Sequence, residues 1–128
     1  MKSRTIAGLG AALALSVTMT AAPALAKDGD VIRRGSCSGA ANAKLKASPE
    51  DGRIEVEGEV DSNRNGQVWR WRIVHNGTIS ARGRSTTHAP SGSFEVRRVL
   101  VDLQGTDTIR FVARHRPSGQ VCRGTVRF

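Results

Sequence analysis

Residues 67–77 read Q-V-W-R-W-R-I-V-H-N-G and hold both tryptophans of the chain. Trp69 and Trp71 alternate here with Arg70 and Arg72. Such alternation is typical of a half-buried β-strand, because successive side chains leave the strand on opposite faces. The stretch therefore predicts a central strand with an indole face in the core and an arginine face outside. The Asn-Gly pair at its end predicts a tight hairpin turn.

The same period of two recurs along the chain in short segments that are separated by turn residues, and no helical periodicity follows residue 26. Seven short strands with regularly spaced turn signals predict an all-β fold, an antiparallel β-sandwich. The expected strands cover residues 43–47, 53–60, 67–75, 78–84, 93–101, 108–115 and 121–128. The expected core residues are Trp69, Trp71, Ile73, Ile54, Val56, Phe94, Ile109 and Phe111.

An acidic row occupies the strand before the tryptophans, where Glu55, Glu57 and Glu59 alternate with apolar residues. If this strand pairs with the tryptophan strand, the glutamates would lie beside Arg70 and Arg72. Opposite charges across neighbouring strands stabilise a sheet slightly, so this arrangement predicts a register device and not a site.

The apolar phase slips once, within residues 93–101. Phe94 and Val96 share one face before the Arg97–Arg98 pair, whereas the valines at 99 and 101 share the other. The slip predicts a β-bulge or a change of sheet at the arginine pair.

The first 26 residues have the pattern of a secretory signal. Lys2 and Arg4 precede an apolar segment, Ile6–Val17, and a small-x-small cleavage site at residues 24–26. The apolar segment is shorter than the roughly 20 residues that a membrane-spanning helix needs. We therefore expect cleavage after Ala26 and a secreted protein, extracellular or cell-wall associated, with no membrane span. Residues 27–36 would form a flexible N-terminal arm and residues 37–128 the sandwich.

Two cysteines, Cys37 and Cys122, follow this signal. An even number in an exported chain indicates a disulfide. The bond would close a loop of about 85 residues, worth roughly 4–5 kcal/mol in chain entropy. A metal site would need more ligands. A catalytic thiol is the other alternative, because residues 35–39 resemble a nucleophile elbow, but no buried strand precedes them and no helix follows.

Arginine dominates the charge. If Lys2 and Arg4 leave with the signal, 18 of the 20 basic residues and all 11 acidic residues remain, which gives a net charge of 18 − 11 = +7. Guanidinium groups pair with phosphate or carboxylate through a bidentate fork. The residues on strand phases opposite the core are candidates for binding anionic polymers such as teichoic acids, acidic glycans or extracellular DNA; they are Arg70, Arg72, Arg82, Arg84, Arg110 and Arg114. Two alternatives need no ligand. The arginines are merely solvated and paired with the glutamate row, or the high arginine content reflects a GC-rich genome.

Four segments carry a resemblance to known proteins. They are S-P-E-D-G-R-I-E-V at 48–56, the stretch G-Q-V-W-R-W-R-I-V-H-N-G at 66–77, A-P-S-G-S-F-E-V-R-R at 89–98, and the closing hairpin at 106–124. With them the chain resembles small secreted actinobacterial proteins of unknown function with an immunoglobulin or fibronectin III-like sandwich. The resemblance implies a fold and a compartment and no activity. The cysteines depart from antibody-type domains, since they lie near the first and last strands, which argues against antibody-like recognition.

The titratable residues predict no enzyme. His75, His88 and His115 belong to no triad motif and lack the short spacing of zinc ligands. We expect no cofactor and no metal site. Specific nucleic-acid binding is also disfavoured, because the aromatic residues fall on the core phase and leave no stacking platform.

We therefore expect a monomeric, non-catalytic secreted or cell-envelope protein that binds an anionic cell-wall polymer through an arginine-rich sheet face. The alternative partner is another exported protein. The chain would then be an interaction module or inhibitor that docks through an edge strand or through the loop at residues 85–91. Polymer binding should weaken steeply with salt, whereas docking through apolar contacts should not.

Overall fold

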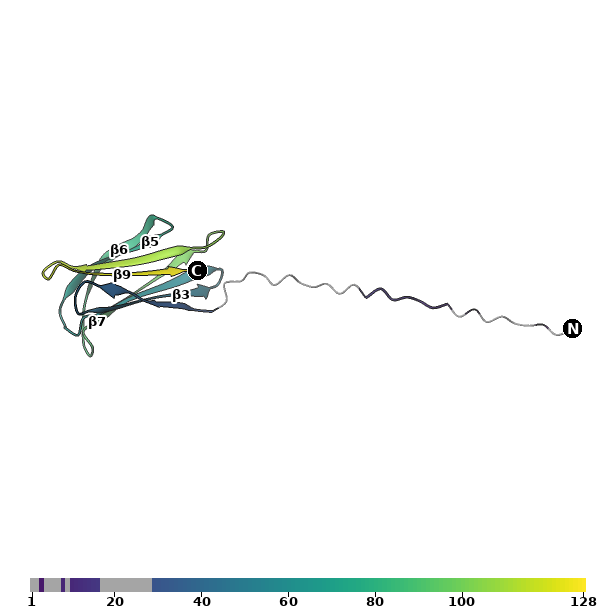
Figure 1. Ribbon diagram of the computed structural model, residues 1–128, viewed down its shortest axis with the longest axis horizontal. Helices are drawn as coiled ribbons and strands as arrows, with labels where there is room; N and C mark the ends of the chain where they lie inside the picture. The colour runs from purple at the N-terminus through teal and green to yellow at the C-terminus, as the bar shows by residue number, and fades with distance from the viewer. Residues whose placement is uncertain (1–2, 4–7, 9, 17–28) are drawn as a thin grey trace.

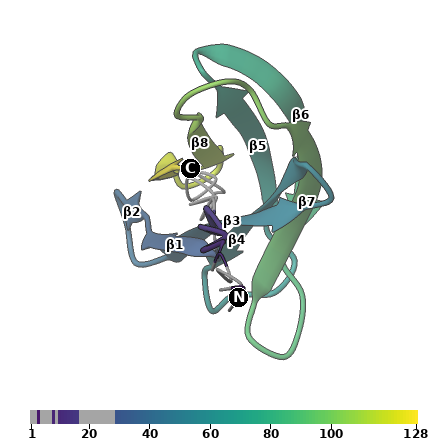
Figure 2. The same ribbon diagram turned by 90° about the vertical axis from the view of Figure 1, so that its right-hand side faces the viewer.

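Two antiparallel β-sheets pack face to face in the computed structural model, which describes residues 3, 8, 10–16 and 29–128 (Figure 1). One sheet has the order β1-β3-β4-β7 and the other β2-β9-β8-β5-β6. The strands are β1 (Val31–Arg34), β2 (Ser36–Cys37), β3 (Asn42–Glu50), β4 (Arg53–Asp61), β5 (Val68–His75), β6 (Thr78–Thr86), β7 (Ser93–Val101), β8 (Thr108–His115) and β9 (Gln120–Arg127). The predicted all-β sandwich is confirmed, with nine strands in the described residues where the sequence indicated seven. Figure 2 shows the two layers, with β6 and β7 at the same side of the sandwich.

The two additional strands come from the segment that the sequence assigned to a flexible arm, and this expectation is wrong for residues 31–36. β1 pairs with the edge of β3, and β2 pairs with the edge of β9. Gly35 lies where the chain passes between the sheets, and a Cβ there would come within 2.5 Å of the carbonyl oxygen of Arg123. Backbone hydrogen bonds hold such edge strands, so the segment needs little apolar content to be ordered.

The cleavage site after Ala26 and most of the expected signal segment lie outside the described residues. The residues of that segment that are described, 3, 8 and 10–16, have no regular secondary structure. Across the described part of the chain, no helix is both long and apolar enough to span a membrane.

The core fills the space between the sheets, and both indoles lie in it. The Trp69 ring stacks on His115 at a centroid distance of 5.4 Å, and its Nε1 donates a hydrogen bond to Gln67. The Nε1 of Trp71 donates to Ser85 Oγ at 3.1 Å. Both indole N–H groups are therefore satisfied although the rings are buried. All eight residues that the sequence assigned to the core are at most 5% exposed: Trp69, Trp71, Ile73, Ile54, Val56, Phe94, Ile109 and Phe111.

Cys37 and Cys122 form a disulfide, as predicted, between directly opposite residues of β2 and β9. The bond attaches the N-terminal edge of the second sheet to the last strand, 85 residues further along the chain. A structural disulfide indicates an oxidising environment outside the cytoplasm.

The glutamate row does not lie beside Arg70 and Arg72, so the predicted pairing is wrong. β4 belongs to the first sheet, between β3 and β7, whereas β5 belongs to the second. Glu57 lies opposite Lys46 on one side and Arg97 on the other. The polar loop between β4 and β5 carries the chain from one sheet to the other, which local sequence periodicity cannot reveal.

The predicted bulge at Arg97–Arg98 is also wrong, because β7 pairs with β4 without a register shift. The inward phase instead continues through Phe94, Val96, Arg98 and Leu100. Arg98 occupies one position of this phase, and its guanidinium carbon lies 5.0 Å from the centroid of the Trp71 ring in a cation–π contact.

The hairpin between β5 and β6 has the predicted tight turn, in which Asn76 and Gly77 both have positive φ, at 47° and 84°. A register shift follows in the ladder, so that Ile73 pairs with Ala81 but Val74 pairs with Ile79. The shift turns Ile79 outward, where it is 52% exposed, although alternation with Ala81 predicted it to face the core.

Candidate functional site

The arginine candidates lie together on the outer face of the β2-β9-β8-β5-β6 sheet. We call this surface the arginine face. It consists of Arg70, Arg72, Arg82, Arg84, Arg110, Arg114, Arg116, Arg123 and Arg127. Eight of them lie on the four strands β5, β6, β8 and β9, and Arg116 lies in the turn after β8.

The strand register places several arginines directly opposite one another. Arg70 of β5 faces Arg84 of β6 on one side and Arg114 of β8 on the other. In the next outward row, Arg72 faces Arg82. Like charges in directly opposite positions destabilise a sheet. The structure therefore concentrates positive charge where sheet stability alone would disfavour it.

The acidic residues lie elsewhere. The strands of this sheet contain eight arginines and no Asp or Glu, whereas β1, β3, β4 and β7 contain seven basic and six acidic residues. Glu55 and Glu57 of the glutamate row form their salt bridges with Arg97 and Lys46, which lie on the same sheet as the glutamates. The expected pairing of these arginines with the glutamate row is therefore wrong, because the two groups lie on different sheets.

The opposite sheet neutralises its own charges. Lys46 Nζ lies 3.4 Å from Asp30 Oδ2 and 3.8 Å from Glu57 Oε2. Arg97 donates a hydrogen bond to the carboxylate of Glu55. This bond lowers the pKa of Glu55 and raises the pKa of Arg97 from their ordinary values. The excess positive charge of the sandwich therefore belongs to one of its two outer surfaces.

Arg70 lies at the centre of the concentrated charge. The positive charges of Arg116 and Arg84 lower the pKa of Arg70 from its ordinary value. The shift has the direction expected of a cation that is surrounded by like charges and lacks a counter-ion. An anion bound at this place would reverse the unfavourable interaction.

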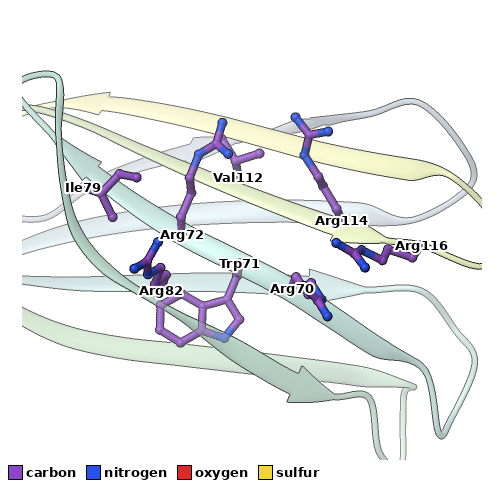
Figure 3. A pocket seen from close by; sticks show the side chains of 8 residues that line it. All are labelled: Arg70, Trp71, Arg72, Ile79, Arg82, Val112, Arg114 and Arg116. Carbon is purple, nitrogen blue, oxygen red and sulfur yellow. The ribbon is translucent and has the colours of Figure 1, made fainter.

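A hollow of about 250 Å³ lies on this face, and we call it the central hollow (Figure 3). Five arginines surround it, from β5, β6, β8 and the turn after β8; they are Arg70, Arg72, Arg82, Arg114 and Arg116. Val112, Ile79 and Trp71 complete the lining. Val112 faces outward between Arg72 and Arg123 and is nevertheless only 2% exposed.

A second hollow of about 360 Å³ adjoins the first and shares Arg70 and Arg116 with it. Arg84 and Pro117 also line it. The structure thus brings five of the six candidate arginines into or between two adjoining hollows. Arg110 lies apart, at the other end of the sheet beside Val74 and Thr125.

Two of the three histidines, His75 and His115, are buried and hydrogen-bonded. His75 Nε2 lies 2.5 Å from Asp107 Oδ1, and both side chains are buried. His115 Nδ1 lies 2.7 Å from the hydroxyl of Ser118 while its ring stacks on Trp69. Within the described residues, no three side chains of His, Cys, Asp or Glu cluster as metal ligands would.

Sequence reasoning found the arginines but missed the apolar part of the site. Val112 lies in an outward phase, and Ile79 faces outward although Ala81, two residues further along the strand, packs against the core. The outward turn of Ile79 comes from the register shift beside the hairpin, which leaves no signal in the composition. Comparison with known proteins adds no guidance to these observations: no family model matches the chain, and neither a curated protein nor a solved structure matches it.

Proposed function

We propose that this protein is a non-catalytic, exported binding module that holds an anionic polymer of the cell envelope against its arginine face. The observation that carries the proposal is the segregation of charge between the sheets. All eight strand arginines of one sheet lack an acidic neighbour in that sheet, while the other sheet is nearly neutral.

A polymer suits this surface better than a small ligand does. The arginines extend over four adjacent strands, from Arg84 on β6 to Arg123 on β9. A surface of one sign attracts opposite charge over long range, which raises the local concentration of a polyanion. Many weak contacts along the chain then add together, so no deep pocket is required.

The sandwich is proposed to be of the immunoglobulin or fibronectin III-like kind. In immunoglobulin domains, strand B pairs with A and E in one sheet, and F pairs with C and G in the other. Here β4 lies between β3 and β7, and β8 lies between β5 and β9. Strands β3, β4, β5, β7, β8 and β9 therefore match A, B, C, E, F and G in order. In this comparison the arginine face belongs to the C-F-G sheet.

The test is retention of the purified protein on cell walls with and without their teichoic acid, over a series of salt concentrations. We expect binding to fall steeply with salt, because each arginine–phosphate contact releases counter-ions. Equal retention on walls stripped of anionic polymer would refute the proposal. Retention that is insensitive to salt would indicate docking on another exported protein instead.

A matched pair of triple variants separates the face from the net charge. Arg70→Gln, Arg72→Gln and Arg114→Gln remove three charges from the arginine face. The control variant removes the same charge from the opposite sheet, at Arg33, Arg34 and Arg53. We expect the first variant to reduce the salt slope, the slope of the logarithm of the binding constant against the logarithm of the salt concentration, by about one unit per arginine. The control should retain most of the slope, and equal losses in both variants would contradict a role of this particular face.

A further inference from the structure

The central hollow differs from the rest of the arginine face because three neighbouring strands and a turn contribute arginines to its lining. Arg70 and Arg72 come from β5, Arg82 from β6, Arg114 from β8, and Arg116 from the following turn. In Figure 3 the side chain of Arg116 extends back toward Arg70, and those of Arg72 and Arg114 rise from neighbouring strands. Five arginines from four elements therefore border one hollow instead of standing in a single row along a strand.

Apolar side chains lie among the arginines of the hollow, where the stems of arginines can pack on them. Val112 lies beside Arg72 on the neighbouring strand, and Arg114 is two residues further along its own strand. This outward-facing valine is only 2% exposed, and it lines the hollow together with Arg72 and Arg114. Arginine stems commonly cover apolar surface while the charged end stays in water. Stems that are ordered in this way lose less conformational entropy when the guanidinium groups bind a ligand.

The arrangement favours one shape of anion over another. A carboxylate is planar and is satisfied by a single guanidinium fork, whereas a phosphate or sulfate group presents oxygens in tetrahedral directions and accepts from several arginines at once. The hollow, at about 250 Å³, is smaller than the roughly 300–1,000 Å³ typical of a pocket for a whole small molecule. Its size is that of a subsite for one group on a larger chain.

We propose that the central hollow is a subsite for a tetrahedral oxyanion, a phosphate or sulfate group carried by the polymer, and that it discriminates against carboxylates. This inference rests on the proposed function and narrows it, since polymers that carry only carboxylates would bind the arginine face without occupying the subsite.

The test is an NMR titration of the isotope-labelled protein with inorganic phosphate, sulfate, and acetate, at constant ionic strength. Phosphate or sulfate should shift the amide resonances around Arg72, Val112 and Arg114. Each should bind about tenfold more tightly than acetate, because acetate forms one charge-assisted hydrogen bond fewer and such a bond corresponds to a factor of about ten in affinity.

Arginine-to-lysine substitutions separate the subsite from general electrostatics. Arg72→Lys with Arg114→Lys keeps the charge of the face but removes two guanidinium forks. We expect this double variant to bind the oxyanion at least about fivefold more weakly, by the same loss of charge-assisted hydrogen bonds. Its retention on anionic polymer at low salt should stay close to that of the wild type. Arg33→Lys with Arg34→Lys, on the opposite sheet, is the control and should leave oxyanion binding unchanged.

Three results would overturn the inference: acetate binding as tightly as phosphate and sulfate, shifts spread evenly over both sheets, or wild-type oxyanion affinity in the Arg72→Lys, Arg114→Lys variant. If any of these occurs while the protein still binds anionic walls in a salt-dependent way, the subsite is refuted and the proposed function stands. If the wild type fails to bind those walls, the proposed function itself is refuted.

Discussion

Gly58 is the position where a single methyl group should test the packing of the sandwich most directly. It lies in β4 on the inward phase, opposite Phe111 of the other sheet. A Cβ at this position would lie 2.7 Å from Phe111 Cδ2 and 2.8 Å from Cε2. Carbon atoms pack best at about 3.5–4.0 Å, so the methyl group would overlap the ring by about 1 Å. Phe111 is fully buried, which leaves the ring little room to move.

We expect Gly58→Ala to destabilise the protein by about 1–2 kcal/mol. Overpacking of a core typically costs about 1–3 kcal/mol. About 0.5–1 kcal/mol is recovered because alanine loses less backbone entropy than glycine on folding into a strand. The free energy of unfolding can be measured by urea titration, followed by the fluorescence of the two buried tryptophans. The melting temperature should fall by roughly 5–10 °C for a domain of this size.

Gly124→Ala is the matched control, because this glycine also faces the core but has more space. Its Cβ would lie 3.4 Å from the Cβ of Leu45, which is ordinary contact. The control should be neutral or stabilising by up to about 1 kcal/mol. A second substitution, Phe111→Leu, should recover part of the loss in the Gly58→Ala background. Wild-type stability of Gly58→Ala, or an equal loss in Gly124→Ala, would refute the packing argument.

Three further predictions follow from the disulfide and the charges. Replacing Cys37 and Cys122 together by serine should lower the free energy of unfolding by about 4–5 kcal/mol, the chain entropy of the loop that they close; a much smaller loss would show that the reduced chain retains structure. Because Arg97 lowers the pKa of Glu55, their pair contributes stability above the ordinary carboxyl pKa of about 4.3 and loses it as the pH falls through the lowered value. The melting temperature of Glu55→Gln should therefore fall less steeply than that of the wild type as the pH is lowered into the acid range. A fall as steep as in the wild type would count against a stabilising role of the pair. Arg70→Gln should raise the urea midpoint at low salt and weaken retention on anionic polymer, since it removes a repelled cation; a lowered midpoint would mean that Arg70 has a stabilising partner.

The fold class could be read from the sequence because both of its signals are local. Alternation shows which side chains face the core, and turn residues show where strands end. The assignment of Trp69 and Trp71 to one face and of Arg70 and Arg72 to the other required no knowledge of the neighbouring strands. The disulfide was predictable for a similar reason, because only one pairing of two cysteines exists.

Which strands would become neighbours was decided by the tertiary structure. Alternation shows the two faces of a strand but not the sheet that contains it, so the glutamates of β4 could have neutralised Arg70 and Arg72 or lain in the opposite layer. The chain crosses between the sheets after β4, and this crossing separates the acidic row from the arginines. The concentration of unpaired positive charge around Arg70 is thus a property of strand order, because electrostatic interaction depends on distance in space and not on position along the chain.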